Sequence, residues 1–420
     1  MFVRKEYAID DNTLNTTTIF EDGKKKYLKD PFNNLIKNEL KYHHNIRIYN
    51  QTQFNPFKII NLETDMKDKI QYSKGILKDT IICTRPIPSN TSDYDYIKFN
   101  MKIFGINLNN LEDNLKADLL MDEDISMENV INSTINFEVK RCTLFQNTNL
   151  LFVEVCHNEL KYLLIYDLLS KVLMKDENNQ VVKLEHQKVI FFETDTKRRI
   201  FGVIHNNIIK KYRLKSYQQN HTFLKDLCIH VQIPNSKNIY NKDDMYVCVN
   251  ESDMNEMIIF ESDLATPIRM YSLKPEKNKI YNVAISNDKS MMVTTSRNGT
   301  SIKLFKKTNT SYALFMIYKR GMNSALNYVI GFSNDDALIF SLSYNRTLHL
   351  YGVEDVNKSL HVIKLSSRIV DDFCDIKIMS DTKSNVYFIY VLWKYNGIIE
   401  MYKFDMKLLT SKKISYVEMY

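Results

Sequence analysis

Glycine, proline and tryptophan are scarce in this sequence: its 420 residues include 9 Gly, 7 Pro and 1 Trp. No Gly-rich phosphate loop, H-E-x-x-H motif or G-x-S-x-G motif is present, so the sequence lacks these common signatures of an enzyme. The 6 cysteines are scattered without a C-x-x-C pair, which favours buried free thiols in a reducing compartment over disulfides or a metal site. The chain is therefore expected not to be an enzyme, and to need no metal or other cofactor.

Long hydrophobic runs are missing as well. The most apolar stretch, residues 386–393, is too short to cross a bilayer, and the first residues do not form a signal-peptide core. The charge excess is mild, with 57 Lys and Arg against 50 Asp and Glu and a net charge of +7. Without a basic-aromatic stripe this balance gives little support to nucleic-acid binding. A cytoplasmic protein is expected, and any membrane association should be peripheral.

Aromatic residues are plentiful, with 22 Phe and 26 Tyr. Together with Val and Ile they form short runs from about residue 56 to the end, separated by Asn, Asp, Ser and Lys. Such runs and spacers are typical of strands and turns. One segment, residues 108–121, has apolar positions that suit a short helix. The sequence therefore predicts an all-β fold.

Two stretches repeat one plan of strand, turn, strand, turn and strand. "ISNDKSMMVTTSRNGTSIKLF" in the first corresponds to "FSNDDALIFSLSYNRTLHLY" in the second, with Ser-Asn-Asp at the first turn of each. The offset of about 47 residues is the period of one propeller blade. Such a unit must stack on neighbours in a ring to bury both faces. The length then fits a seven-bladed β-propeller of WD-repeat type.

The stretch over residues 282–351 resembles the PROPPIN family, WD-repeat-like propellers that bind phosphoinositides in autophagy. Their Phe-Arg-Arg-Gly signature corresponds here to Tyr318, Lys319, Arg320 and Gly321. The chain is similar to a divergent member of fungal type. The resemblance implies a propeller over residues 51–420, with blade five at about 276–318, blade six at about 319–365 and blade seven at about 366–420. Residues 1–50 are expected to be an extension or to close the ring.

Adjacent residues of an extended segment point to opposite sides, so Lys319 and Arg320 are each expected to serve a separate headgroup pocket, while Gly321 permits a tight turn. Arginine offers a fork that matches phosphate, lysine a point charge, and hydroxyls complete the cradle. The resemblance places two sets of residues in these pockets: Arg320, Ser343, Thr347 and His349 in blade six, and Lys319, Ser296 and Thr300 in blade five. His349 would bind phosphate better when charged, so binding is expected to strengthen toward mildly acidic pH.

Two departures from the family pattern leave an alternative open. The first concerns the blade five pocket, where Lys319 replaces an arginine and Glu276 stands where the family usually has a histidine. The second is that only residues 352–359 stand where the family has a long, partly apolar insertion. A single headgroup site binds poorly without a second site or an anchor. In one reading the chain is a monomeric peripheral scaffold that binds phosphatidylinositol 3-phosphate and/or phosphatidylinositol 3,5-bisphosphate, together with autophagy proteins, at vacuolar, endosomal or preautophagosomal membranes. In the other it is a protein-interaction propeller that has lost lipid binding.

Overall fold

The computed structural model divides the chain into two compact units, Met1–Ile48 and Tyr49–Tyr420. In the first unit, β1 (Thr17–Glu21) and β2 (Lys24–Leu28) pair with each other as an antiparallel hairpin. The structure describes residues 17–21, 24–28, 55–58, 79–86, 97–106, 117–127, 138–144, 150–157, 160–168, 170–176, 180–191, 200–216, 222–242, 244–261, 269–275, 279–309, 311–321, 324–343, 345–354, 358–365, 374–381, 384–393 and 398–418.

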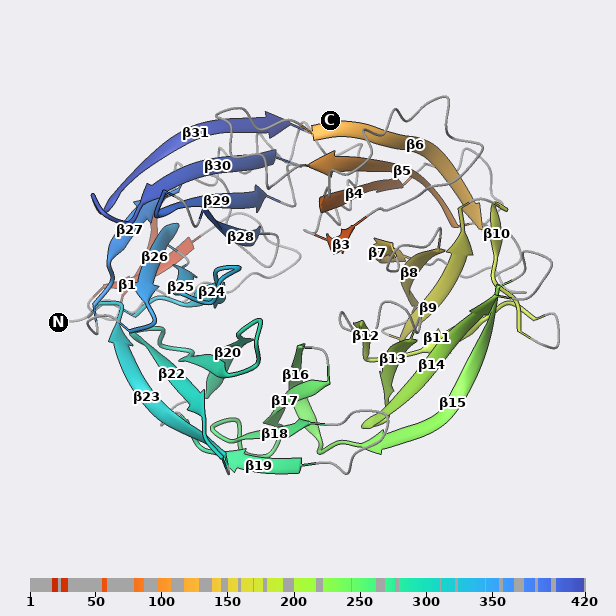
Figure 1. Cartoon of the computed structure of the whole chain (residues 1–420), viewed down its shortest axis with the longest axis horizontal. Helices are drawn as coiled ribbons and strands as arrows, with labels where there is room; N and C mark the ends of the chain where they lie inside the picture. The colour runs from red at the N-terminus through yellow and green to blue at the C-terminus, as the bar shows by residue number, and fades with distance from the viewer. Residues whose placement is uncertain are drawn as a thin grey trace. The chain divides into compact units, whose positions relative to one another are not determined.

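The described strands of the second unit form seven antiparallel sheets, which are the blades of a propeller (Figure 1). The first three blades contain β3 (Asn55–Lys58), β4 (Asp79–Pro86), β5 (Ile97–Ile106) and β6 (Ala117–Met127); β7 (Glu138–Leu144), β8 (Leu150–His157), β9 (Leu160–Asp167), β10 (Val172–Leu173) and β11 (Lys183–Glu185); and β12 (Lys188–Phe191), β13 (Ile200–His205), β14 (Ile208–Ser216) and β15 (Thr222–Gln232). The fourth and fifth contain β16 (Ser236–Lys242), β17 (Met245–Asn250), β18 (Met257–Glu261) and β19 (Arg269–Leu273); and β20 (Ile280–Ile285), β21 (Met291–Ser296), β22 (Ser301–Lys307) and β23 (Tyr312–Lys319). The sixth and seventh contain β24 (Asn327–Phe332), β25 (Leu338–Ser343), β26 (Thr347–Gly352) and β27 (His361–Lys364); and β28 (Cys374–Asp381), β29 (Val386–Trp393), β30 (Ile398–Asp405) and β31 (Thr410–Glu418).

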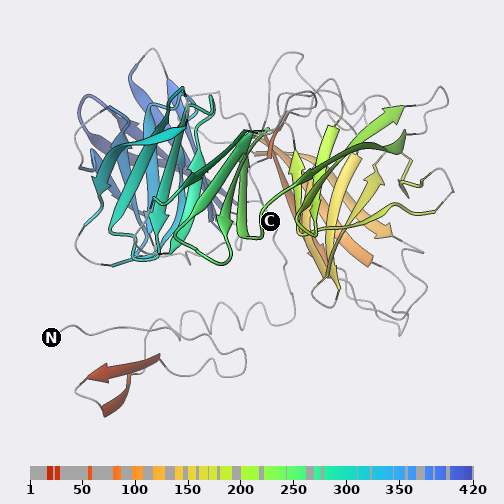
Figure 2. The same ribbon diagram turned by 90° about the horizontal axis from the view of Figure 1, so that it is seen from below.

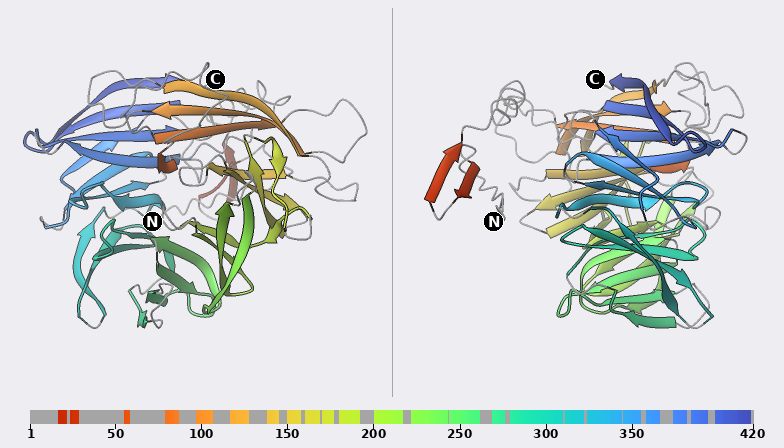
Figure 3. Two further views of the ribbon diagram at one scale, coloured as in Figure 1. Left: turned by 45° about the vertical axis from the view of Figure 1, so that its right-hand side comes forward. Right: turned by 90° about the vertical axis from the view of Figure 1, so that its left-hand side faces the viewer.

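The blades are built alike. Each is a meander in which consecutive strands pair, and in blade 2 the short β11 adds to β9. Seen from other directions, the blades that face the viewer are twisted stacks of strands (Figures 2 and 3). Helices are absent from the described part of the chain. The predicted all-β, seven-bladed propeller is confirmed.

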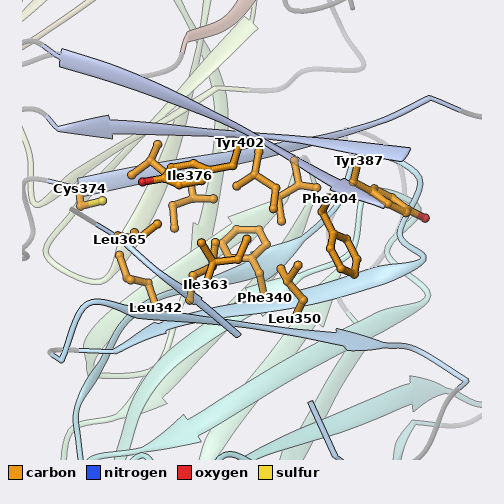
Figure 4. Packing of buried hydrophobic residues seen from close by; sticks show 14 of the residues in the cluster. Phe340, Leu342, Leu350, Ile363, Leu365, Cys374, Ile376, Tyr387, Tyr402 and Phe404 are labelled. Carbon is orange, nitrogen blue, oxygen red and sulfur yellow. The ribbon is translucent and has the colours of Figure 1, made fainter. Parts of the chain in front are cut away.

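Apolar side chains fill the spaces between blades. Seven hydrophobic clusters occupy the seven blade-to-blade interfaces, one each. Between blades 6 and 7, for example, Phe340 and Leu350 pack against Tyr387 and Phe404 (Figure 4). Blade 7 packs in turn on blade 1, where Phe388 and Phe104 share a cluster. The ring is therefore closed by burial of apolar surface, the dominant favourable term in folding.

The repeated Ser-Asn-Asp turns join neighbouring blades. In blade 5, Ser286 Oγ donates to Asp288 Oδ1 at 2.7 Å and accepts from the backbone N of Met291 at 2.9 Å. Asn287 reaches blade 6, where its Nδ2 donates to the carbonyl O of Ser333 at 3.0 Å. In blade 6 the corresponding Asn334 accepts at Oδ1 from the backbone N of Ser380 in blade 7, at 2.7 Å. Each of these turns is thus hydrogen-bonded to the next blade through its asparagine, and the Ser-Asn-Asp repeat in the sequence identifies these turns.

The helix predicted over residues 108–121 is wrong in the part that the structure describes. Residues 117–127 form β6, which pairs along its length with β5. Met121 and Ile125 are buried and lie four residues apart, a spacing that also suits a helix. The burial of Met127 and the exposure of Asp122 and Asp124, however, fit the two-residue alternation of a strand. Pairing with β5 therefore overrides the local pattern, as tertiary context commonly does.

Candidate functional site

The motif at residues 318–321 ends β23 and leads from blade 5 into blade 6. Tyr318 is fully buried, and its hydroxyl donates to the carbonyl O of Gly352 at 2.9 Å and of Val353 at 3.0 Å. Its ring lies against that of Tyr351, with centroids 5.1 Å apart. The next residue, Lys319, is exposed. Tyr318 is therefore the anchor that fixes this junction.

Arg320 is held by the turn between β21 and β22. Its backbone N donates to the carbonyl O of Thr300 at 2.9 Å, and its Nε donates to the carbonyl O of Gly299 at 2.5 Å. Burial lowers the pKa of this guanidinium from its ordinary value, although an arginine stays charged at any physiological pH. The side chain is half-buried, so a charged group is presented at the junction in a fixed direction.

Ser343, Thr347 and His349 share one face of blade 6. Ser343 ends β25 and Thr347 begins β26, and their hydroxyl oxygens are 2.7 Å apart. His349 pairs across the strands with Ser341, so alternation along both strands places all of these side chains on the same face. Tyr351, two residues beyond His349, belongs to the cluster between blades 5 and 6. This face therefore looks toward blade 5 and Arg320.

The protonation of His349 differs from the sequence prediction. The side chain is only 8% exposed, and burial, followed by the nearby charge of Arg320, lowers its pKa to about 4. The imidazole of the free protein is thus neutral in the mildly acidic range where the sequence led us to expect a charge. The physical reason is desolvation, which disfavours the charged form of a buried histidine.

The residues predicted for blade 5 lie around the same end of that blade. Ser296 is buried before the turn, and its carbonyl O accepts from the N of Gly299 at 3.0 Å. Thr300 is half-exposed after the turn, and Lys319 pairs with the adjacent Ser301. The predicted Glu276 lies outside the described residues.

The connection between β26 and β27 brings another cation to the junction. Lys358 forms an isolated parallel bridge with Lys319, so the backbone before β27 runs beside the end of β23. Both lysines are exposed. Residues 353–354 and 358–360 of this short connection are described.

Gly321, in contrast, has no need to be glycine. A Cβ added there would meet nothing within 4 Å, and its φ lies outside the left-handed region. The glycine of the site in the left-handed region is Gly299, with φ +61°, where a Cβ would lie 1.9 Å from the carbonyl O of Ala325. The tight turn expected at Gly321 therefore belongs to Gly299 instead.

Several buried polar groups lie at this junction, and of their residues sequence reasoning singled out His349 alone. The hydroxyls of Ser341 and Tyr351, Nδ1 of His349 and Oδ1 of Asn327 are buried without a hydrogen-bond partner. The Nδ2 of Asn327 donates to the carbonyl O of Gly299 at 3.3 Å. Unpaired buried polar atoms are costly and are most often found where a ligand or a water completes them. The two-residue alternation of a strand, counted from Ser343 and His349, could have identified Ser341 and Tyr351.

Within the described residues, three or more His, Cys, Asp or Glu side chains nowhere gather in a way that would hold a metal ion. None of the described segments is a helix long and apolar enough to span a bilayer.

No protein-family model matches this chain. SVP1-like protein 2 of Debaryomyces hansenii is 33% identical over 87 residues, which cover 21% of this chain and 20% of that protein. Autophagy-related protein 18 of Komagataella pastoris is 26% identical over 118 residues, covering 27% of this chain and 21% of that protein. The chain thus matches about a fifth of the length of these curated relatives.

The fold has relatives among solved structures. Hsv2 of Kluyveromyces lactis superposes with a TM-score of 0.56 at 12% identity, covering 81% of this chain and 96% of that one. At this identity the likeness shows the fold alone, while the sequence matches show common ancestry. The resemblance to the PROPPIN family is therefore confirmed: the homologues of this seven-bladed propeller are PROPPIN proteins.

Proposed function

We propose that this chain is a peripheral membrane scaffold that binds phosphatidylinositol 3-phosphate and/or phosphatidylinositol 3,5-bisphosphate through the junction of blades 5 and 6. It acts in autophagy or in vacuolar or endosomal trafficking, on the cytoplasmic side, as a monomer that also engages autophagy proteins. The role in autophagy is supported by the name of one relative, autophagy-related protein 18; another is named SVP1-like protein 2. Its role is binding rather than catalysis.

The observation that supports the proposal is the setting of Arg320. Its guanidinium is oriented by the carbonyl of Gly299 and lies near His349. Donor groups of blade 6 that have no protein partner face the same junction. A phosphate that enters would receive charge-assisted hydrogen bonds from the guanidinium, which are about twice as strong as neutral ones. Lys319, on the opposite side of the extended segment, serves the blade 5 side with Ser296 and Thr300.

A liposome flotation assay tests this function. Wild-type protein should float with phosphatidylcholine vesicles that contain phosphatidylinositol 3-phosphate, and Lys319→Thr/Arg320→Thr should lose at least about tenfold in binding, since each lost charged contact costs ~1.5–3 kcal/mol. The matched control is Lys175→Thr/Lys183→Thr, because it removes the same charge from two exposed positions of blade 2. It should bind as the wild type does.

Equal flotation of wild type and Lys319→Thr/Arg320→Thr would refute the headgroup site. Because Arg320 also bonds to Gly299, the melting temperature of each variant is measured alongside. The single variant Lys319→Thr gives a second reading that is free of this concern, since its side chain is exposed.

The second candidate is a protein-interaction propeller without lipid binding. Arg320 Nε is already engaged by a carbonyl, and the connection between β26 and β27 is short, and both features favour it. Failure of the folded wild-type protein to float with either phosphoinositide would refute the lipid-binding proposal and favour this alternative.

A further inference from the structure

The exposed apolar side chains of this propeller are unevenly distributed. Ten large apolar side chains of the described residues stand out as exposed, and seven of them belong to blades 5, 6 and 7. On β23 they are Leu314, Phe315 and Ile317, which are 50%, 47% and 41% exposed. Scattered single residues of this kind are normal, but a concentration marks an interaction surface.

The elements that hold these side chains adjoin one another. The end of β23 is bridged to Lys358, just before β27. On β27, Nε2 of His361 lies 2.8 Å from Oγ of Ser411 at the start of β31. Val362, 43% exposed, follows His361, and the β30–β31 turn carries Leu408 and Leu409, 71% and 43% exposed. We call Leu314, Phe315, Ile317, Val362, Leu408 and Leu409 the outer rim; its strands lie on the outside of the ring, at the left of Figure 1 and facing the viewer at the right of Figure 3.

The backbone at the tip of the outer rim is unusual for leucine. Leu409 has φ +51°, a left-handed conformation that Gly or Asn adopts more easily. Asp405 Oδ1 fixes the turn by accepting from the backbone N of Lys407 at 2.8 Å and of Leu408 at 3.0 Å. Two leucines are thus held out into solvent on a fixed turn, where a smaller or polar residue would be less costly.

Lysines surround the outer rim. Lys306 Nζ lies 3.8 Å from the ring centroid of Phe315 and 3.7 Å from Oε1 of the exposed Glu354. Lys407 precedes the leucines of the turn, and Lys319 and Lys358, both exposed, stand at the end of β23. Apolar side chains interleaved with lysines suit the boundary between lipid headgroups and acyl chains. There the apolar groups enter the bilayer and the ammonium groups meet anionic headgroups.

Strand addition is disfavoured at the same place. The register of β22 and β23 shifts between Leu304 and Phe305, which leaves Phe315 as the extra residue of a bulge. Bulges on edge strands protect them from pairing with another chain. The outer rim therefore offers side chains rather than a straight backbone edge, which a lipid surface can use and a partner strand cannot.

We infer that the outer rim enters the surface of an anionic bilayer and is the apolar anchor of this propeller. The inference deepens the proposed function and rests on it, because the rim begins next to Lys319 and Arg320. From Phe315 to Lys319 is four residues, or about 13 Å along a strand. Headgroup site and anchor can therefore reach one membrane together, and binding at both is stronger than binding at either.

Tryptophan scanning tests the inference. The sole tryptophan, Trp393, is 2% exposed and serves as an internal reference. Leu408→Trp and Ile317→Trp are mixed with vesicles of brominated phosphatidylcholine that contain phosphatidylinositol 3-phosphate, phosphatidylserine, or neither. Their fluorescence should be quenched on the anionic vesicles. Val172→Trp is the matched control, because Val172 is 54% exposed on the outer strand of blade 2, and it should not be quenched.

Flotation gives the quantitative reading. Leu408→Ser/Leu409→Ser should lower vesicle binding by about tenfold, the effect of removing two partly inserted leucines, and Leu160→Ser/Val172→Ser should leave it unchanged. Binding of soluble inositol 1,3-bisphosphate, measured by calorimetry, should be the same in all of these proteins. Absence of quenching at residues 317 and 408, or unchanged flotation of Leu408→Ser/Leu409→Ser, overturns the inference while the headgroup site stands.

Other outcomes separate the two proposals. If Lys319→Thr/Arg320→Thr floats as the wild type does and Leu408→Ser/Leu409→Ser does not, the outer rim is supported and the headgroup site fails. If the wild type sediments as a dimer that Leu408→Ser/Leu409→Ser dissociates, without quenching by lipid, the rim binds a second copy and the inference is wrong.

Discussion

Gly299→Ala is expected to lower the free energy of unfolding by about 3 kcal/mol, through strain at positive φ and steric overlap. The φ of +61° is unfavourable for any residue with a Cβ, and that atom would lie 1.9 Å from the carbonyl O of Ala325. The obstacle is backbone rather than the end of a flexible side chain, so the segment around residue 325 or the β21–β22 turn must move. Denaturant unfolding followed by circular dichroism measures the change.

The same substitution should impair the site. The carbonyl O of Gly299 accepts from Nε of Arg320 and from Nδ2 of Asn327. A displaced turn therefore misdirects the guanidinium, and flotation with phosphatidylinositol 3-phosphate should fall with stability. Gly321→Ala is the matched control. Its added Cβ meets nothing within 4 Å, so its stability should stay within about 0.5 kcal/mol of wild type. Equal effects of the two substitutions would contradict this account of the turn.

The two glycines show what the sequence could and could not provide. The resemblance identified Gly321 as part of a motif, but a motif does not tell which glycine has a backbone that only glycine tolerates. Gly299 precedes Thr300 in a hairpin turn of two short strands, and its close approach to Ala325 joins residues 26 positions apart in sequence. Such an approach depends on the packing of two segments and has no local signature.

The repeated turns were readable because their chemistry is local. Ser286 and Asp288 are two residues apart and bond to each other, as do Ser333 and Asp335 in the next blade. Short polar side chains of this kind favour turns by bonding to their own neighbourhood. The hydrogen bond from Asn287 to Ser333 of blade 6 could not be predicted from the sequence, because it depends on how the two blades are placed.

The sequence could predict which blade 6 side chains share a face, but it could not predict how deeply they are buried. Ser343, Thr347 and His349 share a face because strands alternate, and a two-residue period is visible in sequence. Blade 5 lies against this face, with Arg320 near His349 and the ring of Tyr318 against Tyr351. This contact follows from the arrangement of the blades, and the burial it causes changes the chemistry of the histidine. His349 is consequently the residue whose predicted behaviour departs most from the structure.

Acid is expected to destabilise the folded protein through His349. Its pKa is lowered to about 4 in the folded state, against about 6.5 for a histidine in the unfolded chain. Between these values the unfolded chain binds a proton that the folded protein does not. Stability is therefore full above about pH 6.5 and falls as the pH drops toward 4, by about 2 kcal/mol from pH 7 to pH 5 for this one residue.

The prediction is tested best at His349 rather than at His186, which burial also brings to a pKa of about 4. His186 Nε2 lies 3.8 Å from Glu154, whose pKa is raised by burial. A raised carboxyl pKa adds stability as the pH falls, so the two groups oppose each other. At His349 the neighbouring charge is Arg320, which does not titrate in this range. The nearby Tyr351 stays neutral, because burial raises the pKa of its hydroxyl.

His349→Gln should therefore unfold with a pH dependence that is smaller by about 2 kcal/mol between pH 7 and pH 5, measured by denaturant titration at each pH. Arg320→Thr should also reduce this pH dependence of stability, through the neighbouring charge. Removing the positive charge lets the pKa of His349 rise toward its ordinary value, and the acid loss should shrink without any change to the histidine itself. Identical pH profiles for wild type and both variants would mean that the imidazole is neither desolvated nor near the guanidinium.

A bound phosphate should likewise raise the pKa of His349, because an anion stabilises the imidazolium. Binding that takes up a proton below about pH 5, and none at neutral pH, is what this arrangement of Arg320 and His349 requires.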